Sequence, residues 1–231
     1  MKMPSQMQKV VLCVGLFLVL VLGVLNLNVF ARVCANYSEI GFLEPVRPGG
    51  GTFAEGQSAI GGYVVSGAAY LMRAHADFTL LLYRVELWLP GADDNRAILR
   101  RASRCLENMA KAMSAYEKLV VLAGVTPYNP EVGDALYRFD YAAFGQAKGL
   151  NMPVFQAVEP YLRRGDILGV YRDIYSRLGK ISHGLAILRD EIRPGELPAL
   201  DVFYRLQQDY FETLLFGQYV AEVFVEIKEK M

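Results

Sequence analysis

The chain has 231 residues, of which 24 are lysine or arginine and 24 are aspartate or glutamate, so its formal net charge at pH 7 is zero. This balance gives no reason to expect nucleic acid or a strongly acidic substrate as a partner. The length fits one domain plus a targeting or anchoring segment, and it is sufficient to bury a substantial hydrophobic core.

The first segment, residues 1–35, has the pattern of an export signal. Lys2 and Lys9 precede residues 10–25, which carry no charge. This order predicts that the positive end stays inside while the rest of the chain crosses the membrane. The apolar run is close to the ~20 residues that span a bilayer, so a cleavable signal peptide and a retained signal anchor both fit it.

Cleavage would fall after Ala31 or Ala35, where small residues occur. If cleavage does not occur, residues 10–31 hold the protein in the membrane. In both cases we expect an extracytoplasmic protein, on the periplasmic or cell-surface side. Residues 36–54 are rich in glycine and proline and are predicted to be a tether, which leaves residues 55–231 as the folded domain.

The chain has three cysteines, Cys13, Cys34 and Cys105. Cys13 lies in the apolar run, and Cys105 lies at the edge of the apolar stripe of a predicted helix. After cleavage at Ala31, only Cys34 and Cys105 could form a disulfide in an oxidising compartment, and the sequence leaves this pairing open.

The domain is predicted to be all-α. Apolar spacing and turn residues delimit four long helices over residues 57–89, 93–123, 166–192 and 199–228. A connection at 124–165 contains a shorter helix, 131–148, that places Tyr137, Tyr141 and Phe144 on one face. We therefore predict a four-helix bundle of two long helical hairpins joined by an aromatic helical crossover and preceded by an N-terminal signal or anchor helix.

The helix at 57–89 carries polar side chains on two roughly opposite lines at about 100° per residue. One line consists of Arg73, Asp77 and Arg84. The other consists of His75, Thr79 and Glu86. Because Leu71 and Leu82 share the side of His75, we assign that line to the core and the other to solvent.

The inward line suggests a binding site. His75, Thr79 and Glu86, together with Tyr171 and Tyr175 of the third helix, could form a polar pocket for a small ligand. The alternative is a buried network in which these groups satisfy one another. His75 and Glu86 are eleven residues apart, or ~16 Å along a helix, which is too far for one shared metal ion.

Known catalytic patterns are absent from the sequence. It contains no Gly-rich phosphate loop, no Cys-x-x-Cys and no nucleophile elbow. Neither His75 nor His183 has a glutamate three residues earlier, as the di-metal sites of helical bundles require. We predict no catalytic residues, no metal and no cofactor, and we favour a function other than catalysis.

Two surfaces are candidates for binding a partner. The last helix is apolar on two sides, and its second side consists of Tyr204, Phe211, Leu215 and Tyr219. Either the crossover or a partner protein should cover this side. The second helix carries an outward basic stripe that includes Arg96, Arg100 and Arg104, which is either a solvated face or a docking surface for an acidic partner or anionic lipid headgroups.

These features favour an interaction or scaffold subunit of a cell-envelope complex, with a protein partner in the envelope. The alternative is a small-ligand-binding or sensing bundle with a polar core around His75 and Glu86.

Overall fold

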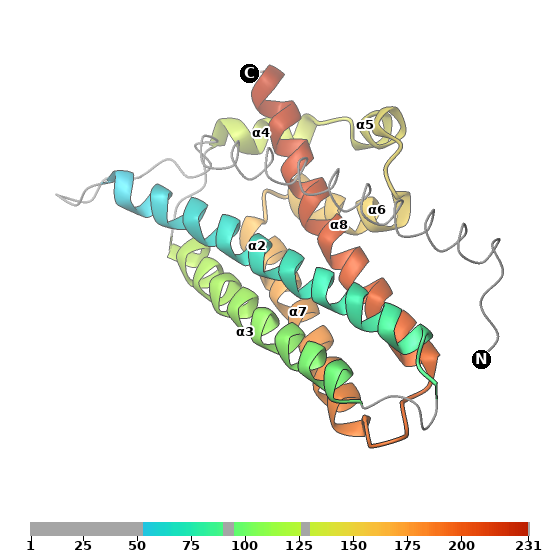
Figure 1. The fold of residues 1–231 in the computed structure, drawn as a ribbon. Helices are drawn as coiled ribbons and strands as arrows, with labels where there is room; N and C mark the ends of the chain where they lie inside the picture. The colour runs from blue at the N-terminus through green and yellow to red at the C-terminus, as the bar shows by residue number, and fades with distance from the viewer. Residues whose placement is uncertain (1–52, 90–94, 126–129, 231) are drawn as a thin grey trace.

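The computed structural model describes residues 53–89, 95–125 and 130–230, and every regular element in these ranges is a helix (Figure 1). The helices are α2 (Phe53–Glu86), α3 (Arg96–Val125), α4 (Pro130–Arg138), α5 (Tyr141–Lys148), α6 (Met152–Arg163), α7 (Ile167–Glu191) and α8 (Leu200–Lys230). The predicted signal or anchor helix, its cleavage sites, Cys13 and Cys34 lie outside the described residues. Along the described ranges, no helix has both the length and the apolar character that a bilayer span needs.

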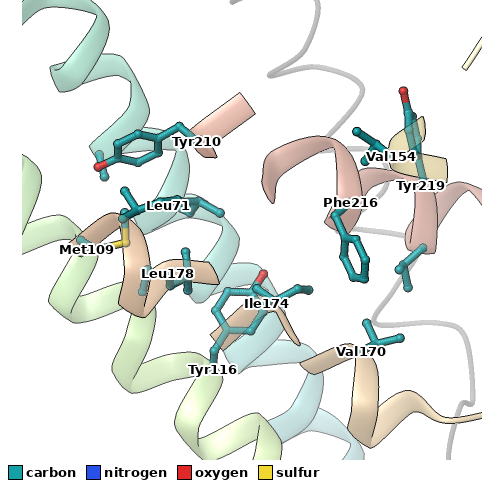
Figure 2. Close-up of a cluster of buried hydrophobic side chains, with 14 of the residues drawn as sticks. Leu71, Met109, Tyr116, Val154, Val170, Ile174, Leu178, Tyr210, Phe216 and Tyr219 are labelled. Atoms are coloured by element: carbon teal, nitrogen blue, oxygen red, sulfur yellow. The ribbon is translucent and has the colours of Figure 1, made fainter. Parts of the chain in front are cut away.

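The four long helices make their contacts in a closed order: α2 packs on α3, α3 on α7, α7 on α8, and α8 back on α2. Figure 2 shows one layer of the resulting core, in which Leu71, Met109, Leu178 and Tyr210 come from four different helices and face one another. All four side chains are buried. The chain thus buries apolar side chains from both long hairpins in one core.

α2 and α3 form the hairpin that was predicted, with an especially close approach near its open end. A Cβ atom at Gly67 would lie 3.0 Å from the ring of Tyr116 and 3.3 Å from the Cβ of Ala115. Glycine costs up to about 1 kcal/mol relative to alanine within a helix, and here its small size lets α3 pack directly on the backbone of α2.

The crossover differs from the prediction. The single helix expected over 131–148 is interrupted, because Asp140 caps α5 by accepting a hydrogen bond from the backbone N–H of Ala143 at 3.0 Å. The break turns Tyr137 away from the face predicted for it, and its side chain is 67% exposed while Tyr141 and Phe144 are buried.

Residues 151–153 begin a further helix, α6, soon after the predicted crossover helix ends. Asn151 caps this helix by accepting a hydrogen bond from the N–H of Val154 at 3.4 Å, and Pro153 lies in the first turn. Proline is tolerated there because the first N–H groups of a helix have no partner within the helix. A sequence that ends one helix can therefore start the next.

The crossover covers the carboxyl-terminal half of α8. α6 packs on α8 and on α7, and α4 packs on α6. The Phe155 ring lies edge-on to the Tyr219 ring at 5.8 Å, and the Asn151 backbone N–H donates to the Tyr219 hydroxyl at 2.8 Å. Tyr219 is consequently 4% exposed, so at this position the second side of α8 is covered by the crossover, which was one of the two predicted alternatives, and Tyr219 is not available to a partner.

At the opposite end of the long helices, the buried side chain of Asn95 joins the two hairpins. Trp88 Nε1 donates to Asn95 Oδ1 at 2.8 Å. Asn95 Nδ2 donates to the carbonyl oxygens of Arg193 and Glu196, which belong to the α7–α8 turn. One amide therefore satisfies groups from both turns and fixes their relative position.

Candidate functional site

The polar line of α2 was predicted to face the core, but the structure places it on the flank. The most deeply buried stripe of this helix is formed by Ala74, Phe78 and Leu81. His75 is half-buried and its ring lies 5.8 Å from that of Tyr210. Burial lowers the pKa of His75 because a low-dielectric environment disfavours the imidazolium. Thr79 donates to the carbonyl oxygen of His75 at 3.0 Å, so its hydroxyl is satisfied within the helix.

Glu86 does not face the core. It is the last residue of α2, it is exposed, and it accepts a hydrogen bond of 2.8 Å from the Tyr204 hydroxyl. The prediction that Glu86 and His75 share an inner line is therefore wrong. The physical reason is that the buried stripe ends at Val85, and the helix terminus leaves the next residue open to solvent.

The two tyrosines assigned to the same pocket come from α7. Tyr171 is buried, which raises its pKa, and Tyr175 is half-buried against the core. α7 packs on α3, α6 and α8, while no backbone contact joins α7 to α2 within the described residues. Tyr171 and Tyr175 thus come from the helix diagonal to the one that carries His75.

Asp77 was assigned to solvent, yet it lies half-buried at the seam between α2 and α3. Its carboxylate accepts hydrogen bonds from Arg101 Nη1 at 3.5 Å and from Asn108 Nδ2 at 3.3 Å. Arg101 is in this way removed from the exposed basic stripe. Sequence periodicity missed this role because residues at the edges of a helix–helix seam look outward when one helix is considered alone.

The interior also contains two protonated groups, the Tyr210 hydroxyl and the Cys105 thiol. The Tyr210 hydroxyl is buried without a hydrogen-bond partner among the described residues, and burial, followed by smaller effects of Cys105 and Asp77, raises the pKa of Tyr210. Burial, together with Asp77, raises the pKa of the Cys105 thiol to about 12. Cys105 is a free, buried thiol, and at neutral pH it is neither a nucleophile nor an anionic ligand.

The predicted site residues do not form one cluster in the described part of the chain. Between residues 53 and 230, apart from the two undescribed loops, no three side chains of histidine, cysteine, aspartate or glutamate are grouped to hold a metal ion. The predicted ligand set is dispersed over a half-buried flank, a helix end and a diagonal helix. The interior of the domain is dominated by hydrophobic contacts.

The second apolar side of α8 is divided into two halves. Its carboxyl-terminal half is covered by the crossover through Tyr219, as described above. In its amino-terminal half, Tyr204 and Phe211 are each 46% exposed, and Leu215 is partly buried against the core. We refer to Tyr204 and Phe211, which lie seven residues apart on one side of the helix, as the aromatic face of α8.

The basic stripe of α3 is placed as predicted. Arg96, Arg100 and Arg104 are exposed, and Arg100 Nε donates to the carbonyl oxygen of Arg96 at 3.3 Å. These side chains lie on the outside of the α2–α3 hairpin, away from the aromatic face of α8. No family model, curated protein or solved structure matches this chain.

Proposed function

We propose that this protein is an exported interaction subunit of a cell-envelope complex, and that the aromatic face of α8 binds its protein partner. The proposal includes a four-helix bundle of α2, α3, α7 and α8, which the closed order of their contacts supports. It also includes the signal or anchor segment within residues 1–35 and an extracytoplasmic location for the domain. The observation that carries it is the exposure of Tyr204 and Phe211 on a helix whose other half is covered by its own crossover.

The side chains around this face have the arrangement found in protein interfaces. Large aromatic residues are enriched at the energetic centres of interfaces, where each buries up to about 150–250 Å². Polar groups lie beside them: Gln208 Nε2 donates to Glu212 at 2.9 Å, and Glu86 accepts from Tyr204. An apolar centre with a polar rim is the usual anatomy of a non-obligate interface.

The hydrogen bond between Tyr204 and Glu86 has a further effect on binding. It joins α8 to the end of α2 and fixes the orientation of an otherwise exposed ring. An immobilised side chain loses less conformational entropy on association, which favours binding by roughly 0.5–1.5 kcal/mol per ordered side chain. Tyr204 is therefore preorganised, while Phe211 supplies apolar area.

Binding of a small ligand in a polar core around His75 and Glu86 has weaker support. Glu86 is exposed, His75 packs its ring on Tyr210, and Tyr171 and Tyr175 belong to a helix whose backbone does not approach that of α2 in the described structure. We therefore rank partner binding first.

A photocrosslinking experiment tests the proposal. A crosslinking phenylalanine analogue is placed at position 211 of the full chain, and at position 137 as a control, since Tyr137 is also aromatic and exposed but lies on α4. We expect a discrete adduct from position 211 in native membranes and none from position 137.

Substitution completes the test. Phe211→Glu should abolish co-purification of the partner that the crosslink at position 211 identifies, while leaving the melting temperature within about 2 °C, because a half-exposed side chain contributes little to the core. Tyr137→Glu should leave recovery unchanged. Equal recovery with Phe211→Glu and the unaltered chain would refute the proposal.

A further inference from the structure

Besides Arg96 at the start of α3, six exposed cations lie on the outer side of the α2–α3 hairpin. We call these six the basic face: Arg73, Arg84, Arg100, Arg104, Lys111 and Lys118. The four on α3 are separated by steps of four, seven and seven residues, which keeps them on one line of the helix. This line extends over ~27 Å at 1.5 Å per residue.

Contacts across the seam show that the rows of α2 and α3 are neighbours. Arg73 Cζ and Lys111 Nζ lie 5.7 and 5.6 Å from the centre of the same Tyr70 ring. Lys118 Nζ lies 5.1 Å from the centre of the Tyr63 ring. Arg73, Lys111 and Lys118 therefore rest on aromatic rings of α2, which joins the cations of the two helices at this part of the seam.

Acidic residues do not neutralise this surface. Asp77, the carboxylate at the seam, is engaged by Arg101 and Asn108. Two exposed acids, Glu107 within the row and Glu117 outside it, stand on α3 against the six cations. α8, whose backbone does not approach that of α3 in the described structure, contains six acidic and three basic residues. A chain of zero net charge thus separates its charges, with a basic side and an acidic side.

Exposed leucines lie among the cations. Leu80, on α2, is 47% exposed and lies seven residues after Arg73, and Leu87, which directly follows the last residue of α2, is 52% exposed. Cations mixed with outward aliphatic side chains are typical of helices that lie on a lipid bilayer, where the leucines enter the interfacial region. A long row of cations also matches a continuous anionic surface better than a single small anion.

We propose that the basic face docks on an anionic lipid bilayer, with its arginines and lysines at the headgroup phosphates and Leu80 and Leu87 in the interface. The chain order supports this occupant, because the uncharged run at residues 10–25 precedes α2, separated by the predicted tether. The basic face lies on the side of α2 remote from Glu86 and Tyr204. A partner on the aromatic face of α8 and a bilayer on the basic face can consequently be bound together. The argument from chain order rests on the membrane segment of the proposed function, whereas the cations and leucines of the basic face are independent of it.

Lysine labelling of the full chain tests the inference at the level of single residues. The protein is reconstituted in vesicles of phosphatidylcholine alone or with about one third phosphatidylglycerol, and an amine-reactive reagent is applied. Mass spectrometry then compares Lys111 and Lys118 with Lys180, which is exposed on α7. Each cation near an anionic surface raises the membrane affinity about fivefold, and a lysine held at the headgroups is shielded from the reagent. We therefore expect Lys111 and Lys118 to be labelled about fivefold less, or lower still, on anionic vesicles.

Two matched variants remove the same charge from different faces. Arg100→Gln with Arg104→Gln should lower the charge-dependent affinity by about 25-fold and restore labelling of Lys111. Arg172→Gln with Arg205→Gln, on α7 and α8, should change neither the affinity for anionic vesicles nor the labelling of Lys111. Salt at 1 M, where the screening length is about 3 Å, should abolish the protection of the unaltered chain.

Equal labelling of Lys111 and Lys118 on the two kinds of vesicle would overturn the proposal. So would protection that appears only when envelope proteins are added to the vesicles, since that result assigns the basic face to an acidic protein. Protection that requires phosphatidylglycerol and is lost only in the Arg100 and Arg104 variant supports it.

Discussion

Replacing Tyr210 by phenylalanine should stabilise the domain. Tyr210 is completely buried, and its hydroxyl oxygen has no hydrogen-bond partner in the described structure. In the unfolded chain this hydroxyl is hydrogen-bonded to water, so folding removes that interaction without replacing it. The substitution deletes the oxygen atom and leaves the ring in place.

The expected gain follows from this difference. An unsatisfied buried polar group costs ~1–3 kcal/mol. The contacts of the ring with His75 at 5.8 Å and with Phe78 at 5.3 Å are retained by phenylalanine. We therefore expect an increase of about 1–2 kcal/mol in the free energy of unfolding, or a rise of about 2–8 °C in Tm for a domain of this length.

The measurement is urea unfolding of the full chain followed by circular dichroism, with Tyr141→Phe as the matched control. Tyr141 is also buried, but its hydroxyl donates to the carbonyl oxygen of Leu136 at 2.9 Å. Tyr141→Phe removes this hydrogen bond and leaves the Leu136 carbonyl oxygen with the 3.4 Å hydrogen bond from the Phe139 N–H, so it should destabilise the domain by about 0.5–1.5 kcal/mol. The same replacement of tyrosine by phenylalanine is thus expected to raise the free energy of unfolding at position 210 and to lower it at position 141.

Alkaline pH gives a second measurement on the same variant. Burial raises the pKa of Tyr210, so above pH ~10 the unfolded chain loses this proton while the folded chain keeps it. Stability that is fully present below pH ~10 is therefore lost as the pH rises further, at up to about 1.4 kcal/mol per pH unit. Tyr210→Phe should show a smaller loss. If the variant is instead less stable than the unaltered chain at neutral pH, the hydroxyl has a partner such as a bound water, and the reasoning is refuted.

Two further predictions concern side chains that join or flank the helices. Asn95→Ala should lower the free energy of unfolding by about 2–4 kcal/mol because three hydrogen bonds are lost. The fluorescence of Trp88, the only tryptophan, should shift to the red because its indole loses its hydrogen-bond acceptor. An unchanged emission spectrum would contradict this prediction. Burial lowers the pKa of His75, so stability present above pH ~6.5 should fall as the pH is lowered, and His75→Gln but not His183→Gln should flatten this fall in melting curves between pH 7 and 5.

The long helices could be predicted from the sequence because apolar spacing and turn residues act locally. The turn at 193–198 and the helices on either side of it agree with the structure to within about two residues. The crossover could not be predicted as well, since Asp140 and Asn151 serve as helix caps whose effect depends on backbone geometry. A cap and a stop use the same residue types.

The candidate sites show a similar limit. The exposure of Tyr204 and Phe211 agrees with the predicted outward side of the last helix, whereas Tyr219 is covered by a segment almost 70 residues earlier in the chain. The burial of Glu86 was wrongly predicted because a helical projection does not show where the helix ends. Tyr210 and Asn95 were not singled out for their present roles, since both depend on neighbours from other helices.

The side chain of Asn95 also has a consequence for the order of folding. Its hydrogen bonds to Arg193 and Glu196 span 98 and 101 residues, whereas the α2–α3 hairpin closes through a short turn. Ordering a long loop has a greater entropic cost than closing a hairpin, so each hairpin should form before the two associate. Because Asn95 is the link between the two turns, its amide protons should exchange with solvent only when the hairpins separate, and their exchange rate would measure the free energy of that separation.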